Sequence, residues 1–131
     1  MPQTYLTASS VLFWLTGLLA VGIIFIGGRF IVAPLPAARD FGVPVPETKT
    51  FTYLWTKGTR DIVSGLFVVV LLGLKVSLGV LAAFLFVASL IPFGDMLNVW
   101  ASVRGKNVPA LMIHGGTCVF MCVLAFLILR L

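Results

Sequence analysis

The stretch VLFWLTGLLAVGIIFIGG, Val11–Gly28, indicates a membrane protein, because it holds 18 consecutive residues without a charged side chain. About 20 residues of α-helix span the ~30 Å hydrocarbon core of a bilayer. Ser9 or Ser10 can cap the start of such a helix, and Pro34 cannot continue it. We therefore expect a membrane helix over about residues 10–32.

Three further apolar runs follow, and they predict helices over about residues 51–74, 76–103 and 109–129. The second of these should kink at Pro92–Gly94. Membrane-spanning β-strands would alternate apolar and polar residues, which these runs do not. With 60% hydrophobic residues, the chain is expected to be an all-α membrane protein, a single four-helix transmembrane bundle over residues 1–131.

Two polar segments are expected to be loops. Ala33–Thr52 holds four of the seven prolines and is predicted to form a loop with one helical turn near Pro36–Phe41. Arg104–Pro109 is the second. The positive-inside rule places both loops in the cytoplasm and both termini on the opposite side, in the endoplasmic reticulum membrane if the cell is eukaryotic. The basic residues on the loop side are Arg39, Lys49, Arg104 and Lys106, against Lys75 and Arg130 on the other.

The net charge of +5 does not indicate nucleic-acid binding, because most basic residues flank apolar runs, where Lys and Arg anchor helices at the lipid surface. Membrane lipid is the expected partner. Cys118 and Cys122 lie four residues apart on one predicted helix and make no CxxC pair. A disulfide at that spacing would be strained, so free thiols are expected.

Ionisable side chains inside the apolar runs are the candidate functional residues. Lys57, Arg60, Asp61 and Ser64 are spaced i, i+3, i+4 and i+7, which is one helix face. Charged groups at the bilayer centre cost at least ~2.5–3.5 kcal/mol each, so they are rare unless they pair or function.

These groups are predicted to lie at similar depth. At ~1.5 Å per helical residue, Asp61 lies ~12–15 Å, Asp95 ~12 Å and His114 ~8 Å from their helix ends on the loop side. Arg29 lies on the same side. One cavity that opens towards that leaflet can therefore collect them.

Two carboxylates, a guanidinium and an imidazole at similar depth could carry out acid–base catalysis. A carboxylate can activate water, and a second carboxyl or His114 can donate a proton. Arg60 can hold the carboxylates and stabilise developing oxyanion charge. Such a site suits opening of a strained ether, isomerisation or cyclisation of a lipophilic substrate, and requires no metal or other cofactor. Each group also has a structural interpretation: ion pairs between helices for Arg60 and Asp61, a turn for Asp95, a core histidine for His114 and a snorkelling side chain for Lys57.

Four segments together resemble a known family: RFIVAPLPAARDFGVP (29–44), KGTRDIVSG (57–65), IPFGDMLNV (91–99) and the histidine that opens the last helix. They resemble a family of small four-helix membrane proteins from fungi and bacteria, described as a domain of unknown function. The chain also looks broadly like DoxX-type four-helix membrane proteins. The KG-x-RD motif at Lys57–Asp61 is the most specific part of this resemblance.

Some fungal relatives belong to polyketide and meroterpenoid pathways, where epoxide opening or cyclisation has been suggested. The resemblance thus implies a membrane-embedded hydrolase or cyclase that opens an epoxide on a lipophilic natural product. The Asp–Arg–Asp logic of limonene-type epoxide hydrolases is an analogy of chemistry alone, because that fold is soluble and unrelated. The candidate site residues are Asp61, Asp95, Arg60 and His114 for catalysis, and Lys57, Asn98, Arg29, Asp40 and Ser64 for substrate binding.

Two other functions stay open. A non-catalytic binding or scaffold subunit would have ion pairs that close on each other, whereas an enzyme should hold a cavity of ~300 Å³ or more. A small proton-coupled transporter would typically carry a carboxylate in its first helix, which has none before Arg29. Homo-oligomerisation is also open, because the small residues Gly17, Gly22, Gly27 and Gly28 allow close helix packing within or between chains.

Overall fold

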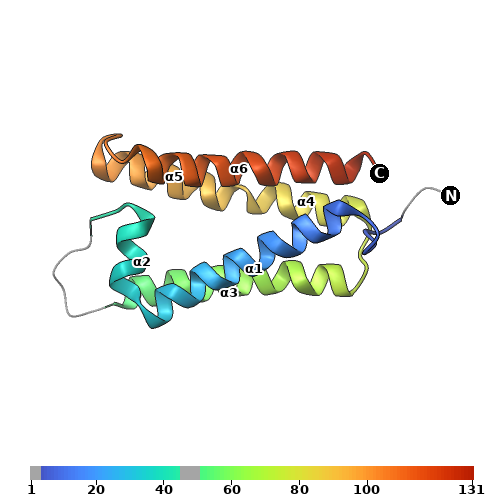
Figure 1. Ribbon diagram of the computed structural model, residues 1–131, viewed down its shortest axis with the longest axis horizontal. Coiled ribbons are helices and arrows are strands. Elements are labelled where there is room, and N and C mark those ends of the chain that lie inside the picture. The colour runs from blue at the N-terminus through green and yellow to red at the C-terminus, as the bar shows by residue number, and fades with distance from the viewer. Residues whose placement is uncertain (1–3, 45–50) are drawn as a thin grey trace.

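A computed structural model describes residues 4–44 and 51–131, and it is all-α (Figure 1). The loop residues Pro46, Glu47 and Lys49 lie outside the described ranges. Within those ranges the helices are α1 (Val11–Val32), α2 (Pro34–Phe41), α3 (Thr52–Gly73), α4 (Leu78–Ala88), α5 (Leu90–Val103) and α6 (Val108–Leu129).

The predicted four-helix transmembrane bundle is wrong. The described chain has six helices, and three stretches are long and apolar enough to cross a membrane: α1, α4 together with α5, and α6. The expected membrane character is therefore confirmed. Helix α3 has the same 22-residue length as α1 but is not among these stretches, because its first half carries Lys57, Arg60 and Asp61. The predicted membrane helix over residues 51–74 was long enough to cross a bilayer only because it included these three charged residues.

Helix α2 occupies part of the segment predicted as a loop. Pro34 is its first residue, where its missing N–H costs nothing. Gly42 ends it with a left-handed backbone, φ 97°. A Cβ at Gly42 would lie 2.5 Å from the Cβ of Ala110 and 2.9 Å from Asn107 Nδ2. Only glycine therefore fits where the end of α2 meets the start of α6.

The interruption between α4 and α5 falls at Ser89, three residues before the predicted kink at Pro92–Gly94. Pro92 has no N–H for the Ala88 carbonyl, and its ring crowds the residue four positions earlier. The helix therefore breaks one turn before the proline. Ser89 is buried there, donates a 2.6 Å hydrogen bond to the Phe86 carbonyl and accepts one from the Cys122 thiol at 3.3 Å.

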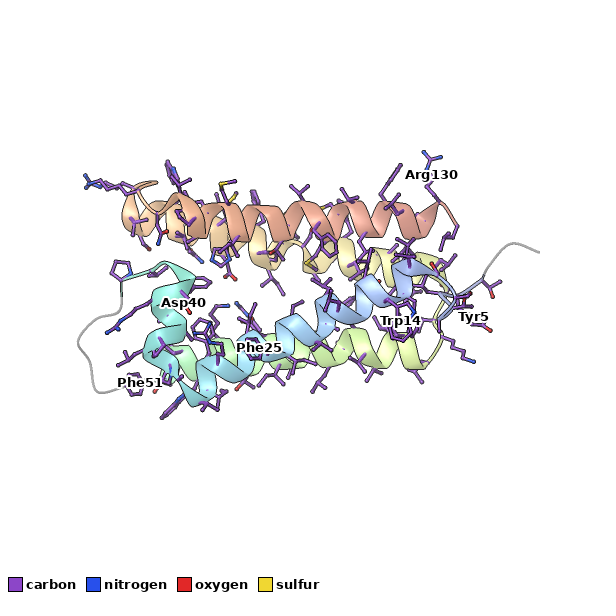
Figure 2. The ribbon with its side chains drawn as sticks, viewed as in Figure 1. Tyr5, Trp14, Phe25, Asp40, Phe51 and Arg130 are labelled. Carbon is purple, nitrogen blue, oxygen red and sulfur yellow. The ribbon has the colours of Figure 1, made fainter. Side chains whose placement is uncertain are left out.

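The helices pack in two groups, and helices that lie side by side within each group run antiparallel. Helix α1 lies along α3, and α6 lies along α4 and α5 (Figure 1). The start of α1 and the C-terminus lie at one end of the molecule, with α2 and the α5–α6 connection at the other (Figure 1). Tyr5, Trp14 and Arg130 mark the first end and Asp40 the second (Figure 2). The two groups meet in an apolar core that includes Leu81, Leu85, Leu124 and Ile128.

Glycines bring α1 and α3 into backbone contact. A Cβ on Gly27 would lie 2.6 Å from the Gly58 carbonyl oxygen, and one on Gly58 would lie 2.7 Å from the Gly27 carbonyl oxygen. Two turns on, a Cβ on Gly65 would meet the Ala20 carbonyl oxygen at 2.7 Å. This close approach fixes α3, and therefore its charged first half, against α1.

Gly58→Ala is expected to destabilise the protein by ~1–3 kcal/mol, because the new methyl group overlaps backbone that cannot move independently. Gly28→Ala is the matched control. Nothing lies within 4 Å of a Cβ on Gly28, so the better helix propensity of alanine should leave stability unchanged or raised by up to ~1 kcal/mol. Thermal unfolding in detergent, followed by circular dichroism, measures both. Equal effects at the two positions would contradict the close crossing.

Candidate functional site

An ion cluster centred on Lys57 joins α3 to α5. The Lys57 ammonium lies 2.7 Å from Asp61 Oδ2 and 3.4 Å from Asp95 Oδ2. Arg60 adds two longer contacts, with Nε 3.6 Å from Asp61 Oδ1 and Nη2 3.7 Å from Asp95 Oδ1. Lys57, Arg60 and Asp61 lie on adjacent turns of α3, whereas Asp95 comes from α5. The structure thus brings together two carboxylates that are 34 positions apart in the sequence (95 − 61).

Burial distinguishes the two cations. The side chains of Asp61, Asp95 and Lys57 are 8%, 14% and 16% exposed, whereas that of Arg60 is 50% exposed. A buried carboxylate needs a close cation to offset its lost hydration. Lys57 makes the shorter contacts with both carboxylates, so it holds them in the position that we expected Arg60 to take.

Two aromatic rings complete the surroundings of the Lys57 ammonium. Its nitrogen lies 5.0 Å from the ring centroid of Phe30 on α1 and 4.7 Å from that of Phe41 on α2. Ring faces attract a cation at such distances. Helices α1, α2, α3 and α5 thereby all contribute to holding one ammonium group.

His114 lies beside the cluster and is bound to α2. Its Nε2 is 3.0 Å from the carbonyl oxygen of Phe41, and the two rings are tilted with centroids 4.6 Å apart. A carbonyl oxygen only accepts, so Nε2 carries the hydrogen of this bond. The Gly42 turn positions the Phe41 carbonyl for this contact.

A cavity of about 120 Å³ lies against the cluster. Its walls come from all six helices and are mostly apolar, for example Ile23 of α1, Val68 of α3 and Met121 of α6. Lys57, Asp61, Asp95 and His114 also line it, together with Ser64 and Thr117. The cavity is smaller than the ~300 Å³ that we expected for an enzyme.

Three of the predicted site residues lie elsewhere. Arg29 and Asp40 form an exposed ion pair of 2.6 Å between α1 and α2, with side chains 38% and 63% exposed, and neither lines the cavity. Asn98 is exposed and does not line the cavity either. Ser64 does line it, but its hydroxyl donates a 2.8 Å hydrogen bond to the Arg60 carbonyl.

Phe30 and Phe41 were not among the predicted site residues, and Lys57 was predicted only to bind substrate. Phe30 and Phe41 are common core residues, and nothing in the pattern separates them from the other nine phenylalanines (11 − 2). The central place of Lys57 did have a signal, because the spacing from Lys57 to Asp61 is i to i+4 on one helix. Within residues 4–44 and 51–131, no three His, Cys, Asp or Glu side chains gather closely enough to hold a metal ion.

The cluster is balanced in charge, with two carboxylates against one ammonium and one guanidinium. Bringing a charged ligand into the cavity would upset this balance in an apolar setting, at a cost that the cluster cannot offset. A neutral ligand with one hydrogen-bonding atom suits the site best. Chemically, the cluster offers carboxylates that accept protons and an ammonium that donates a hydrogen bond.

Comparison with known proteins gives one result that bears on identity. Neither the curated proteins nor the solved structures include a match to this chain, so the likeness to DoxX-type proteins stays a prediction. A family profile matches residues 20–128, which include every ion pair and the whole cavity described above. This match confirms the expected relation to a family without an assigned activity, and the chain belongs to that family, described as a domain of unknown function, DUF4267.

Proposed function

We propose that the protein is a membrane-embedded enzyme that opens an epoxide on a neutral, lipophilic substrate by acid–base catalysis. The observation that carries the proposal is the meeting of Asp61 and Asp95, from separate helices, at the edge of an apolar cavity, where both contact one ammonium. Buried paired carboxylates of this kind are costly, and they cluster at functional sites.

Asp95 is the proposed general base. Its contacts with Lys57 and Arg60, at 3.4 and 3.7 Å, are longer than those of Asp61, at 2.7 and 3.6 Å. A carboxylate that is held less tightly is freer to take a proton. Asp95 would accept a proton from water in hydrolysis, or from a hydroxyl of the substrate in cyclisation. Asp61 would hold Lys57, and Arg60 would steady both carboxylates.

The cavity limits which part of a substrate enters. An apolar cavity of about 150 Å³ holds a benzene molecule, so the 120 Å³ here suits the epoxide and the two or three carbon atoms next to it. The rest of a larger natural product would extend towards the surrounding lipid. Lipophilic substrate and membrane lipid are therefore the proposed partners.

The proposal includes an orientation. The end of the molecule with α2 and the α5–α6 connection carries Arg39, Arg104 and Lys106, which are exposed. By the positive-inside rule this end faces the cytoplasm. The expectation that both termini face the opposite side assumed four spans, whereas three stretches of the described chain are long and apolar enough to cross. In a eukaryotic cell the membrane would be that of the endoplasmic reticulum, where multi-span proteins are inserted.

A non-catalytic scaffold is the second candidate, and two observations favour it. The cavity of about 120 Å³ is smaller than the ~300 Å³ expected of an enzyme. Lys57, Asp61 and Asp95 already satisfy one another without a ligand, as a purely structural tie between α3 and α5 would. Such a protein would still need the cluster for stability but would turn over no substrate. Turnover therefore separates the two candidates.

The direct test is formation of diol from cyclohexene oxide and styrene oxide by the purified protein in lipid nanodiscs, followed by gas chromatography. Both probes are neutral, and each places its epoxide beside one small ring. We expect diol formation that is proportional to protein concentration and well above the background in empty nanodiscs. Rates equal to those of empty nanodiscs for both probes would contradict the proposed function and favour the scaffold.

A further inference from the structure

Few side chains that line the cavity can donate a hydrogen, and most of these hydrogens are already bonded to backbone carbonyl oxygens. The Thr117 hydroxyl donates to the Ile113 carbonyl at 2.8 Å, and the Ser64 hydroxyl donates to the Arg60 carbonyl at 2.8 Å. His114 Nε2 donates to the Phe41 carbonyl at 3.0 Å. Each of these hydrogens is held by an oxygen of the protein itself, and a bound epoxide would have to compete for it.

Lys57 is the exception among the polar residues that line the cavity. An ammonium has three N–H groups, and the Lys57 ammonium contacts two oxygens, Asp61 Oδ2 and Asp95 Oδ2. In the described part of the chain its third N–H has no oxygen partner. The rings of Phe30 and Phe41, with centroids 5.0 and 4.7 Å from the nitrogen, attract the charge of the ammonium but supply no oxygen to accept that hydrogen. One donor therefore remains for a ligand.

We propose that Lys57 is the general acid of the reaction, the group that gives its proton to the epoxide oxygen. This rests on the proposed function and replaces the carboxyl or His114 that the sequence suggested for the task. Arg60 cannot serve, because a guanidinium does not give up its proton in proteins and Arg60 does not line the cavity.

The cluster takes up and supplies every proton that the reaction moves. The Asp95 carboxylate takes a proton from water while the water oxygen forms a bond to an epoxide carbon. The C–O bond of the epoxide breaks, and its oxygen takes a proton from the Lys57 ammonium. Asp95 is then a neutral acid and Lys57 a neutral amine, 3.4 Å apart. Transfer of the proton from Asp95 to Lys57 restores both groups, and the net reaction adds one water to one epoxide.

Lys57→Arg tests the role of the proton apart from the role of the charge. Arginine keeps the positive charge beside Asp61 and Asp95 but does not release a proton. If Lys57 is the acid, diol formation from styrene oxide should fall by ~10²-fold or more, while the folded fraction, measured by size-exclusion chromatography and circular dichroism, stays close to that of wild type.

Chemical rescue supplies a readout that a structural role would not produce. In Lys57→Ala, added methylammonium should restore part of the lost rate, because it brings both charge and proton. Tetramethylammonium is the matched control, because it brings the charge without a transferable proton. If Lys57→Ala does not fold, the Lys57→Arg result stands alone.

The outcomes separate this proposal from the proposed function. An inactive wild type overturns the function and this role with it. An active wild type with Lys57→Arg within about threefold of its rate overturns the role of Lys57 alone. Equal rescue by methylammonium and tetramethylammonium also overturns it, since charge would then be sufficient.

Discussion

Replacement of Asp95 by Asn is expected to lower the rate of diol formation by ~10²–10⁴-fold, the usual contribution of a general base. Asparagine has almost the shape of aspartate and can still accept a hydrogen bond from the Lys57 ammonium at the position now 3.4 Å away. It cannot take a proton from water. The loss should therefore appear in the catalytic rate of the folded protein, separately from the loss of stability caused by the unbalanced positive charge. Initial rates with cyclohexene oxide measure it.

Asp40→Asn is the matched control for Asp95→Asn. Asp40 also pairs with a basic side chain, but it is 63% exposed and does not line the cavity. Its replacement should leave the rate within about twofold of wild type. A rate for Asp95→Asn that is as high as that for Asp40→Asn would remove Asp95 from the mechanism.

Replacement of Lys57 by Met is expected to lower the free energy of unfolding by ~3–5 kcal/mol, because it leaves two buried carboxylates without their nearest cation. Methionine fills a similar volume, so the lost charge dominates the effect. Arg60 contacts both carboxylates at 3.6 and 3.7 Å, but its half-exposed guanidinium compensates only in part. Denaturation in mixed micelles, followed by circular dichroism, gives the free energy.

Arg29→Met is the control for Lys57→Met. The ion pair between Arg29 and Asp40 is just as short, 2.6 Å, but it lies at the surface. Exposed pairs contribute about 0–1 kcal/mol, because water solvates both partners when the pair breaks. Equal losses for the two variants would show that burial does not govern the energetics of the Lys57 cluster.

The chain's membrane character and the grouping of its ionisable residues could be predicted from the sequence. Apolar run length fixes α1 and α6, and the i to i+4 spacing already links Lys57 to Asp61. The number of membrane-spanning helices was predicted wrongly. The uncharged part of α3 is too short to cross a bilayer, and the prediction lengthened it by including the three charged residues in the first half of the helix. The position of the α4–α5 break follows from Pro92 only when the carbonyl four residues earlier is considered.

The site itself was only partly predictable, because spacing gives depth along a helix and not the face that it turns to its neighbours. Arg29, Asp40 and Asn98 were predicted to bind substrate, but they lie outside the cavity. Phe41 enters the site through the turn at Gly42, and that contact depends on tertiary packing. The leading role of Lys57 over Arg60 likewise depends on relative burial, 16% against 50% exposed.

A single turnover in H₂¹⁸O measures whether this buried cluster activates water against an epoxide. Protein in excess over styrene oxide would be mixed in labelled water and the diol analysed by mass spectrometry. The account predicts one ¹⁸O atom in the diol of the first turnover, formed by wild type and not by Asp95→Asn. Unlabelled diol would show that a carboxylate attacks the epoxide itself, and no diol would show that the cluster performs no such reaction; either result would contradict the account.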